Sequence, residues 1–431
     1  MTKAQKIAAP RGTEDILPPH SARWSALEER MRALATRFGY GEIRTPTFES
    51  TDLFVRGVGE ATDIVQKEMY TFTDRGGRSL TLRPEWTAPV VRAVLEHNLL
   101  AHGPQRLFYI GSIFRYERPQ KGRLREAHQF GVECFGYAQP EADAEVIALA
   151  DALLREMGVR DVTLRLNSVG DARCRPRYRE ALIAHFRTNA ARLSDDSRRR
   201  LEVNPLRILD SKDPADRALI ASAPRQDAFL CESCRAHVTQ VRAALEASGV
   251  AYELDPLLVR GIDYYTRTVF EFTAGSLGAQ NAVCGGGRYD DLVAQLGGPP
   301  TPAVGFALGI ERLLMVLEAQ ESVNAHAPLG AGRRGIQVIP LGERARSAAL
   351  PLVAELRRRL HAPVFVDYAD RKLLAHFKLA DRNRARHALI LGDDELEAGE
   401  LVLRDLEDRT ERRLPLDSGK DVAAMLAEIT A

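Results

Sequence analysis

The feature that most constrains the fold is a break in the pattern of secondary structure at residues 321–333. Small and polar residues fill this stretch, whereas helix-like and strand-like segments alternate on both sides of it. Such a composition is typical of a linker between domains. A chain of 431 residues is also longer than one ordinary domain. We therefore expect two domains, residues 1–320 and 334–431, joined by this linker.

The first expected domain mixes helices and strands in an order that predicts an α+β fold. Amphipathic periodicity predicts helices at 25–38 and 141–157. Runs of β-forming residues predict strands, the clearest of which are 79–82, 108–116, 162–167 and 269–273. Residues 173–247 are rich in Arg and Ala and almost free of β-branched runs. This composition indicates a helical insertion within the domain.

The second expected domain has a β-α-β-α-β order, which predicts an α/β fold with a mixed sheet. Its expected strands are 336–339, 364–366 and 388–391, and its expected helices are 344–360 and 372–383. Charge is divided unevenly here: residues 333–390 hold 13 basic and 5 acidic side chains, and residues 391–431 hold 5 basic and 12 acidic ones. This pattern fits either one positive face for nucleic acid or two solvated helix surfaces.

Composition excludes several classes of protein. Apolar residues make up 45% of the chain and charged residues 28%, as in globular proteins. We find no run of about 18 apolar residues that would span a membrane. The first 19 residues lack the apolar centre of a secretory signal, so we expect a cytoplasmic protein without membrane partners. The five cysteines are odd in number and scattered, which argues against a disulfide framework.

Two of the cysteines form a lone Cys231-Glu-Ser-Cys234 pair. A single pair of this spacing is weak evidence for zinc, although Cys174 and His237 could in principle complete a site. The alternative is two thiols at the start of a helix. We expect no tightly bound metal in this protein.

The densest chemical signal is a basic segment at residues 114–129. It holds five arginines and lysines within eleven residues, between two strand-like flanks, and it contains a Pro and a Gly. A basic hairpin suits a polyphosphate or a nucleic-acid backbone. A solvated charged hairpin is the alternative. Glu117, His128 and Gln129 are mixed with the basic residues and favour a ligand site.

This segment resembles motif 2 of the class II aminoacyl-tRNA synthetases, which pairs Phe114-Arg-Tyr-Glu117 with a basic loop. Gly41-Glu-Ile-Arg-Thr-Pro46-Thr-Phe-Glu49 resembles motif 1, and Gly305-Phe-Ala-Leu-Gly309-Ile-Glu-Arg312 resembles motif 3. Each motif alone is loose, but three in this order are specific. The resemblance implies an antiparallel catalytic sheet flanked by helices, and a homodimer formed around motif 1.

A further segment is similar to a signature of the histidyl-tRNA synthetase family. It reads Leu258-Val-Arg260-Gly-Ile-Asp-Tyr-Tyr265-Thr-Arg267-Thr-Val-Phe-Glu271-Phe, and Gly286-Gly-Arg-Tyr289-Asp290 is similar to a second signature. The resemblance extends over essentially the whole chain. It implies that the protein activates histidine with ATP and Mg²⁺ and transfers it to the 3′-terminal adenosine of tRNA(His). The C-terminal domain would then bind the anticodon.

The resemblance also implies roles for individual residues, and each role suits the chemistry of its ligand. The α-ammonium of histidine would be held by Glu85, Thr87 and Gln129, and the imidazole by Glu133, Tyr265 and Tyr289. A carboxylate and phenol hydroxyls can satisfy both ring nitrogens of an imidazole. A pocket built around such polar partners rejects isosteres that lack them by a factor of ~10⁴.

Arginines would serve the ATP side of the site. The resemblance implies that Arg115 and Arg260 are catalytic and stabilise charge at the α-phosphate. The ATP-binding set would be Arg115, Glu117, Arg123, Arg260 and Arg312. At the tip of the basic loop, Arg118 and Gln120 would contact the acceptor end of the tRNA. No metal ligand is expected among the side chains.

Two positions depart from the family pattern. Trp86 stands where a glycine is usual, and its ring would either narrow the pocket or repack its wall. Ala127 stands where an aromatic ring usually stacks on adenine, a contact worth roughly 1–3 kcal/mol. Either ATP binds more weakly or another ring, such as Phe130, compensates.

Two other functions were weighed. The first is that of a paralogue that keeps the fold but acts as a regulatory or binding subunit. Trp86 and Ala127 are the best support for it. Such relatives usually lose the basic-loop arginines and the C-terminal domain, and this chain retains both. A synthetase for threonine, proline or glycine is the second, and the segment from Arg260 to Arg267 argues against it.

Overall fold

The computed structural model describes residues 7–120, 122–278, 281–324 and 332–416. The chain divides into two compact units, residues 1–329 and 330–431. Part of the predicted linker (325–331), Lys121 of the basic segment, and residues 417–431 of the predicted C-terminal domain lie outside the described residues.

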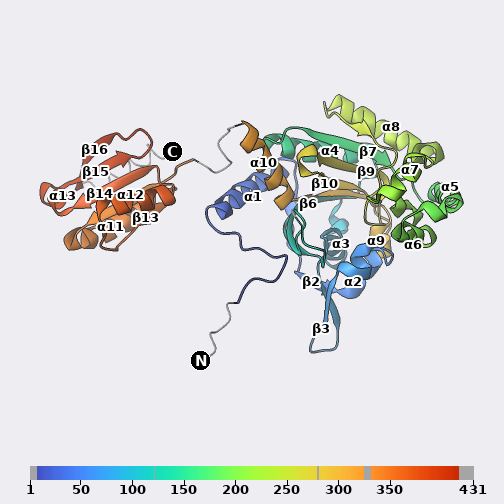
Figure 1. Ribbon diagram of the computed structural model, residues 1–431, viewed down its shortest axis with the longest axis horizontal. Coiled ribbons are helices and arrows are strands. Elements are labelled where there is room, and N and C mark those ends of the chain that lie inside the picture. The colour runs from blue at the N-terminus through green and yellow to red at the C-terminus, as the bar shows by residue number, and fades with distance from the viewer. Residues whose placement is uncertain (1–6, 121, 279–280, 325–331, 417–431) are drawn as a thin grey trace. The chain divides into compact units, whose positions relative to one another are not determined.

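An eight-stranded sheet forms the centre of the first unit (Figure 1). The six middle strands pair antiparallel, and the short strand at each edge pairs parallel with its neighbour. Across the sheet the order is β1 (Gly41–Glu42), β5 (Gln105–Phe114), β6 (Glu126–Phe135), β11 (Ala303–Gly309), β10 (Ala282–Arg288), β9 (Thr266–Ala274), β7 (Val162–Ser168) and β8 (Glu253–Leu254). The predicted α+β fold with an antiparallel sheet is confirmed, and the parallel edges are an addition to it.

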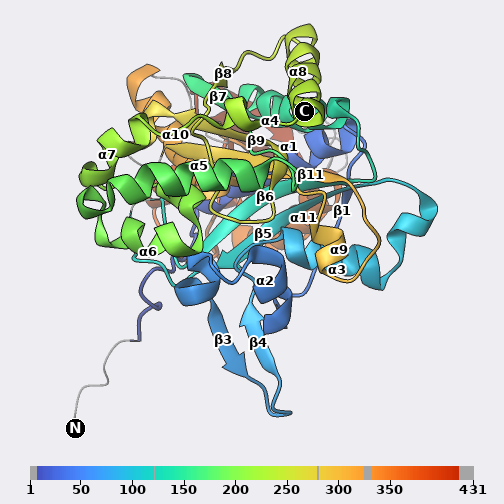
Figure 2. The ribbon, with the colours of Figure 1, turned by 90° about the vertical axis from the view of Figure 1, so that its right-hand side faces the viewer.

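Helices cover both faces of this sheet (Figure 2). On one face lie α1 (His20–Arg37), α4 (Pro140–Glu156), α8 (Glu232–Ala247) and α10 (Ile310–Asn324), which share the main core with the strands. On the other face lie α3 (Thr87–Glu96) and α9 (Leu292–Gln295) with a second core. Side chains alternate along a strand, so Phe130 and Val132 of β6 enter the main core while Gln129 and Glu133 point to the opposite face.

The helical insertion has a small core of its own. Its helices α5 (Arg175–Thr188), α6 (Asp195–Val203) and α7 (Pro214–Ala221) surround buried side chains that include Leu182, Phe186 and Leu219. The carboxylate of Asp216 accepts hydrogen bonds from three serine hydroxyls and so ties these helices together. Helix α8 differs, because its Val241 and Leu245 belong to the main core.

A three-stranded sheet lies beside the second core. It consists of β2 (Phe48–Ser50), β4 (Ser79–Leu82) and β3 (Tyr70–Thr73), in that order, and α2 (Thr51–Val58) follows β2. The hairpin of β3 and β4 projects from the unit (Figure 2). Pro46 of the motif 1 segment lies in the link between β1 and β2. This sheet leads directly through residues 83–86 into α3, which places Glu85 at the start of that helix.

The second unit has a five-stranded mixed sheet in the order β13 (Val364–Val366), β12 (Ile336–Leu341), β14 (His387–Gly392), β15 (Glu400–Asp405) and β16 (Glu411–Pro415). The first three strands are parallel, and their crossover helices are α11 (Glu343–Arg359) and α12 (Leu373–Arg382). This confirms the predicted β-α-β-α-β order. A short α13 (Asp393–Ala398) and the hairpin of β15 and β16 complete the unit beyond what the sequence indicated.

Within the described residues, no helix combines the length and apolar character that crossing a membrane requires.

Candidate active site

A cavity of about 320 Å³ opens between the β4–α3 connection, the faces of β5, β6 and β10, the segment 258–265, and the start of α10. All side chains predicted to bind histidine or ATP line it: Glu85, Thr87, Arg115, Glu117, Arg123, Gln129, Glu133, Arg260, Tyr265, Tyr289 and Arg312. The two residues predicted to contact tRNA, Arg118 and Gln120, do not line it. Both are exposed on the loop between β5 and β6.

Glu133 lies at the deep end of this cavity. Its Oε1 accepts a hydrogen bond from the Thr87 hydroxyl at 2.7 Å, and its Oε2 accepts one from the Tyr289 hydroxyl. The Tyr109 hydroxyl lies 3.4 Å from Oε1. Burial raises the pKa of Glu133 to about 8. A carboxyl in this setting favours a ligand that brings its own hydrogen-bond donor or positive charge.

Space for the Glu133 carboxylate depends on a glycine across the sheet. Glu133 is the register partner of Gly305 on β11. A Cβ atom at position 305 would lie 2.0 Å from Glu133 Oε2. Any other residue there would displace the carboxylate, so the glycine-rich character of β11 has a direct steric reason.

Glu85 lies just before α3, and Thr87 is the first residue of that helix. The Glu85 carboxylate accepts the backbone N–H groups of Thr87 at 2.7 Å and Ala88 at 2.8 Å, which leaves it fixed at the helix N-terminus. Burial raises the pKa of Glu85. The Tyr264 hydroxyl donates to Thr87 Oγ1 at 3.2 Å. Gln129, from β6, completes this side of the cavity.

Four arginines surround the other half of the cavity. Arg115 donates through Nε to the Pro84 carbonyl at 2.8 Å, and Arg260 pairs with Glu271 at 2.8 Å. Arg312, in the first turn of α10, donates to the Ala282 carbonyl at 2.8 Å, and Arg123 pairs with Glu117. These contacts fix the guanidinium groups around one volume. A polyphosphate is the ligand that such a set fits.

Repulsion between the arginines indicates that this half of the cavity binds an anion. Burial lowers the pKa of Arg312, and the nearby charges of Arg123 and Arg115 lower it further. Burial also lowers the pKa of Arg123, and the nearby charge of Arg115 lowers it further. An anion bound among these arginines would raise the pKa values of Arg312 and Arg123 again.

A glycine also makes room for Arg260. A Cβ atom on Gly285 of β10 would lie 2.4 Å from the Arg260 guanidinium. The run of three glycines in β10 therefore lets the segment before β9 lie directly on the strand. We interpret this run as the reason that Arg260 reaches the cavity.

Sequence reasoning did not single out three polar residues of this site. Tyr109 contacts Glu133, Tyr264 contacts Thr87, and Glu271 pairs with Arg260. Tyr264 stands inside the quoted signature, beside Tyr265, so its position was a usable signal. Glu271 stands near the end of the same signature, whereas Tyr109 lies in an ordinary strand, where side-chain type alone does not distinguish a site residue from a packing one.

Comparisons with known proteins agree with this arrangement. A family model described as "Histidyl-tRNA synthetase" matches residues 12–313, and one described as "Anticodon binding domain" matches residues 336–424. The chain belongs to the histidyl-tRNA synthetase family. It is therefore an enzyme, a ligase of the aminoacyl-tRNA synthetase class, with an anticodon-binding domain at its C-terminal end.

Individual members of the histidyl-tRNA synthetase family are similar along their whole length. The "Histidine--tRNA ligase" of Acidovorax ebreus (strain TPSY) is 48% identical, covering 98% of this chain and 99% of its own. That of Prochlorococcus marinus (strain MIT 9303) is 50% identical, covering 96% and 95%. The crystal structure of apo S. aureus histidyl-tRNA synthetase is 37% identical with a TM-score of 0.79, covering 99% and 100%.

The two departures from the histidyl-tRNA synthetase pattern have different outcomes in the structure. Trp86 is 3% exposed and lies between two neighbours. Its ring stacks on Tyr109, with centroids 4.7 Å apart, and the Arg83 guanidinium lies 3.6 Å from the ring centroid. Of the two alternatives raised for Trp86, the structure favours a repacked wall, because the residue lines the cavity while its ring is held in the second core.

Ala127 lines the cavity as expected, but the suggested compensation by Phe130 is wrong. Phe130 is fully buried in the main core, where it packs against Phe108 and Phe306. Ala127 and Phe130 are three residues apart on β6, and side chains alternate along a strand, so the two point to opposite faces of the sheet. Phe130 therefore cannot reach a ligand in the cavity. Ala127 and Phe130 therefore cannot share one adenine site.

Proposed function

We propose that this chain joins histidine to tRNA(His) in two steps at the cavity around Glu133 and the four arginines. The observation that carries the proposal is the division of that cavity. One end presents a buried carboxylate ringed by hydroxyls, and the other presents guanidinium groups. The first suits an imidazole and the second suits ATP, so one cavity can bring the two substrates together.

The first step is activation. The histidine carboxylate attacks the α-phosphorus of ATP, a new P–O bond forms, and the bond to pyrophosphate breaks. Arg115 and Arg260 are the catalytic residues in this proposal and stabilise the charge that builds on the α-phosphate. Arg123 and Arg312 bind the outer phosphates, which reach the site with Mg²⁺, and Glu117 helps to orient Arg123.

Histidine selection rests on the residues at the other end. In this proposal Glu85, Thr87 and Gln129 hold the α-ammonium, and Glu133, Tyr265 and Tyr289 hold the ring. The raised pKa of the buried Glu133 supports this assignment, because an imidazole N–H stabilises the carboxylate that burial disfavours. Amino acids that lack such a donor leave Glu133 without a partner.

The second step transfers histidine to the terminal adenosine of the tRNA. A ribose hydroxyl attacks the activated carbonyl carbon, an ester bond forms, and AMP leaves. Arg118 and Gln120 are exposed at the tip of the β5–β6 loop, outside the cavity, which suits a contact with the acceptor strand. We further propose that the chain works as a cytoplasmic homodimer. Exposed Phe48 of the motif 1 segment and exposed Phe72, with ring centroids 6.3 Å apart, support an interface there.

Histidine-dependent ATP–pyrophosphate exchange tests the proposal on the purified chain, with threonine, proline and glycine as controls. Exchange with histidine alone is the expected result. Exchange with a control amino acid would overturn the assignment of the Glu133 pocket. No exchange from folded protein with any amino acid would instead favour the regulatory or binding subunit.

The tRNA contact has its own test. Arg118→Ala and Gln120→Ala should leave pyrophosphate exchange unchanged and slow the transfer of histidine to tRNA by about tenfold, as expected for the loss of one charge-assisted contact. Equal losses in both reactions would show instead that the loop acts on activation.

A further inference from the structure

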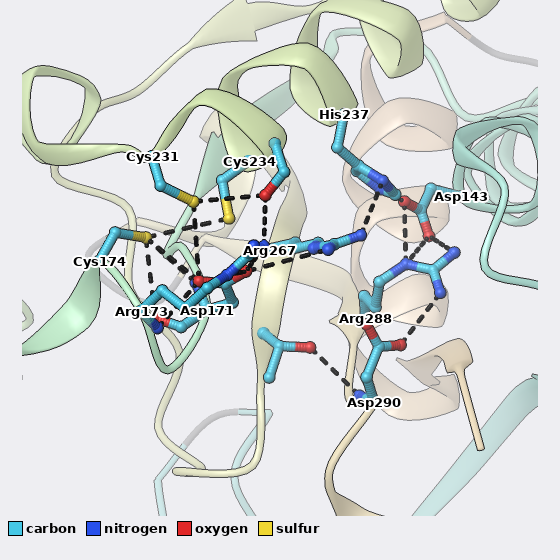
Figure 3. A network of polar contacts seen from close by, with 12 residues as sticks. Asp143, Asp171, Arg173, Cys174, Cys231, Cys234, His237, Arg267, Arg288 and Asp290 are labelled. Atoms are coloured by element: carbon cyan, nitrogen blue, oxygen red, sulfur yellow. Dashed lines mark hydrogen bonds and ion pairs between the residues drawn. The ribbon is translucent and has the colours of Figure 1, made fainter. Parts of the chain in front are cut away.

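Four potential metal ligands gather at a place that is separate from the cavity (Figure 3). Asp171 and Cys174 come from the turn between β7 and α5, and Cys231 and Cys234 come from the start of α8. One atom of each residue lies within 4.8 Å of the corresponding atoms of the other three. Cys174 and Cys234 are 2% and 0% exposed. We call these four residues the thiol cluster.

Distances in the thiol cluster match a four-coordinate metal. The Sγ atoms of Cys174 and Cys234 are 3.9 Å apart, and Asp171 Oδ1 lies 3.7 Å from Cys174 Sγ and 3.8 Å from Cys231 Sγ. With Zn–S bonds of about 2.3 Å, the edges of a tetrahedron are roughly 3.8 Å long. Three of the six edges therefore already have the length that a zinc tetrahedron requires, and the other three are no longer than 4.8 Å.

The carboxylate of Asp171 is oriented by arginines. Arg173 donates to Asp171 Oδ2 at 2.7 Å, and Arg267 lies 3.9 Å from the same oxygen. Oδ2 is thus engaged with cations, while Oδ1 faces the thiols. In metal sites, a side chain that coordinates the metal through one atom is typically held by hydrogen bonds to its other atom.

Charge is balanced by the same arginines. Zn²⁺ with three thiolates and one carboxylate carries a net charge of about −2, which Arg173 and Arg267 offset. Three sulfur ligands also favour zinc over magnesium or calcium, which prefer oxygen. His237, which the sequence left open as a further ligand, is turned away, because its Nε2 contacts Asp143 and its Nδ1 faces Arg267 (Figure 3).

We propose that Asp171, Cys174, Cys231 and Cys234 bind one structural Zn²⁺ that fixes the start of α5 to the start of α8, beside Arg267 of β9. This replaces the expectation of no bound metal. The lone CxxC pair was weak evidence because its two partners lie about 60 residues earlier in the chain, a spacing that no short motif captures. Only the fold brings the two pairs together.

The zinc would act on the histidine pocket through two short connections. Arg175, next to Cys174, donates to the backbone carbonyl of Tyr265. The second connection begins at Arg267, two residues after Tyr265, which links Asp171 to His237. His237 contacts Asp143, and Asp143 pairs with Arg288, the neighbour of Tyr289. This effect on the pocket rests on the proposed function, whereas zinc binding itself does not.

Metal content of the purified full chain is the direct test. Protein prepared under reducing conditions without chelator should hold one zinc per chain by elemental analysis. Cys174→Ser and Cys234→Ser should lose it, and Cys134→Ser, a buried cysteine of the main core outside the thiol cluster, should retain it. Zinc content far below one in the wild-type chain, or unchanged in the Cys174→Ser variant, would overturn the proposal.

A second measurement covers variants that fold poorly. Zinc-free wild-type chain titrated with Co²⁺ should develop thiolate-to-cobalt charge-transfer absorption that saturates at one equivalent. Arg173→Ala, a change at a side chain 63% exposed, should weaken metal affinity by about 10–100-fold while keeping all four ligands. An absent cobalt spectrum, or a disulfide among the three cysteines found by alkylation without reductant, would refute the zinc site whatever the exchange activity is.

Discussion

The hydroxyl of Thr87 lies 2.7 Å from Oε1 of Glu133, so one hydrogen bond joins the first turn of α3 to the middle of β6. The resemblance places these residues at opposite ends of a bound histidine. Their contact shows that the two ends are built as one hydrogen-bonded unit. A change at Glu133 should therefore be felt at the α-ammonium end as well.

Glu133→Gln should lower kcat/KM for histidine by about 10–200-fold, because a hydrogen bond to a charged partner is worth about 1.5–3 kcal/mol. Most of the loss should appear as a higher KM for histidine in pyrophosphate exchange. Tyr289→Phe removes one donor to the same carboxylate and should cost less, about 2–10-fold. A loss in Tyr289→Phe equal to that in Glu133→Gln would contradict the central place of the carboxylate.

The stability of the folded chain should fall as the pH rises, because Glu133 loses its proton. The pKa of Glu133 rises on folding from 4.5 to about 8, so the folded chain holds this proton more tightly than the unfolded chain. The contribution is therefore fully present below about pH 4.5 and is lost as the pH rises to about 8. The melting temperature of the wild type should drop over this range relative to that of Glu133→Gln. Parallel curves for the two proteins would show that Glu133 does not titrate there.

Arg260→Gln should lower kcat for activation by about 10²–10³-fold with little change in KM for histidine, as for the loss of a group that stabilises transition-state charge. The change also leaves Glu271 without its partner. The double variant Arg260→Gln, Glu271→Gln separates the two causes. If it recovers activity, Arg260 serves to neutralise Glu271. Arg78→Ala, whose side chain is 80% exposed, is a matched control that should behave as wild type.

Trp86→Gly should destabilise the chain by about 3–5 kcal/mol, since it removes a buried ring from the second core. Tyr109 would lose its stacking partner, so KM for histidine should rise as well. Trp86→Phe keeps a ring and should show a smaller loss of both. Denaturant unfolding and exchange kinetics measure the two effects. A Trp86→Gly variant with wild-type stability would mean that the wall closes over the gap.

Much of the fold could be predicted from the sequence because periodicity marks each element locally. The helix expected at 141–157 is α4, Pro140–Glu156, one residue earlier. Pro140 explains its start, since the first turn needs no N–H from that residue. The hairpin of β15 and β16 was not predicted, because charged residues such as Arg404 and Glu411 obscure the alternation of Leu401 and Leu403. Those two leucines are nevertheless buried in the second unit.

The candidate site was predictable where a residue stands within a motif, as Gln129, Arg260 and Tyr289 do through resemblance. It was not predictable where the partner comes from a distant strand. Tyr109 belongs to no quoted motif, and it contacts Glu133 only because β5 pairs with β6 in the sheet. Asp171 was not predicted for the same reason, whereas Cys174, Cys231 and Cys234 were considered as zinc ligands from the sequence.

The pairing of Glu133 with Gly305 has a consequence for synthesis of the chain on the ribosome. β6 must wait for β11, which is made roughly 170 residues later, about 10–30 s at ordinary rates of translation. Until then Glu133 has no strand on that side and no pocket to line. A nascent chain released before β11 should therefore have no affinity for histidine, even though it already carries the segments resembling motifs 1 and 2.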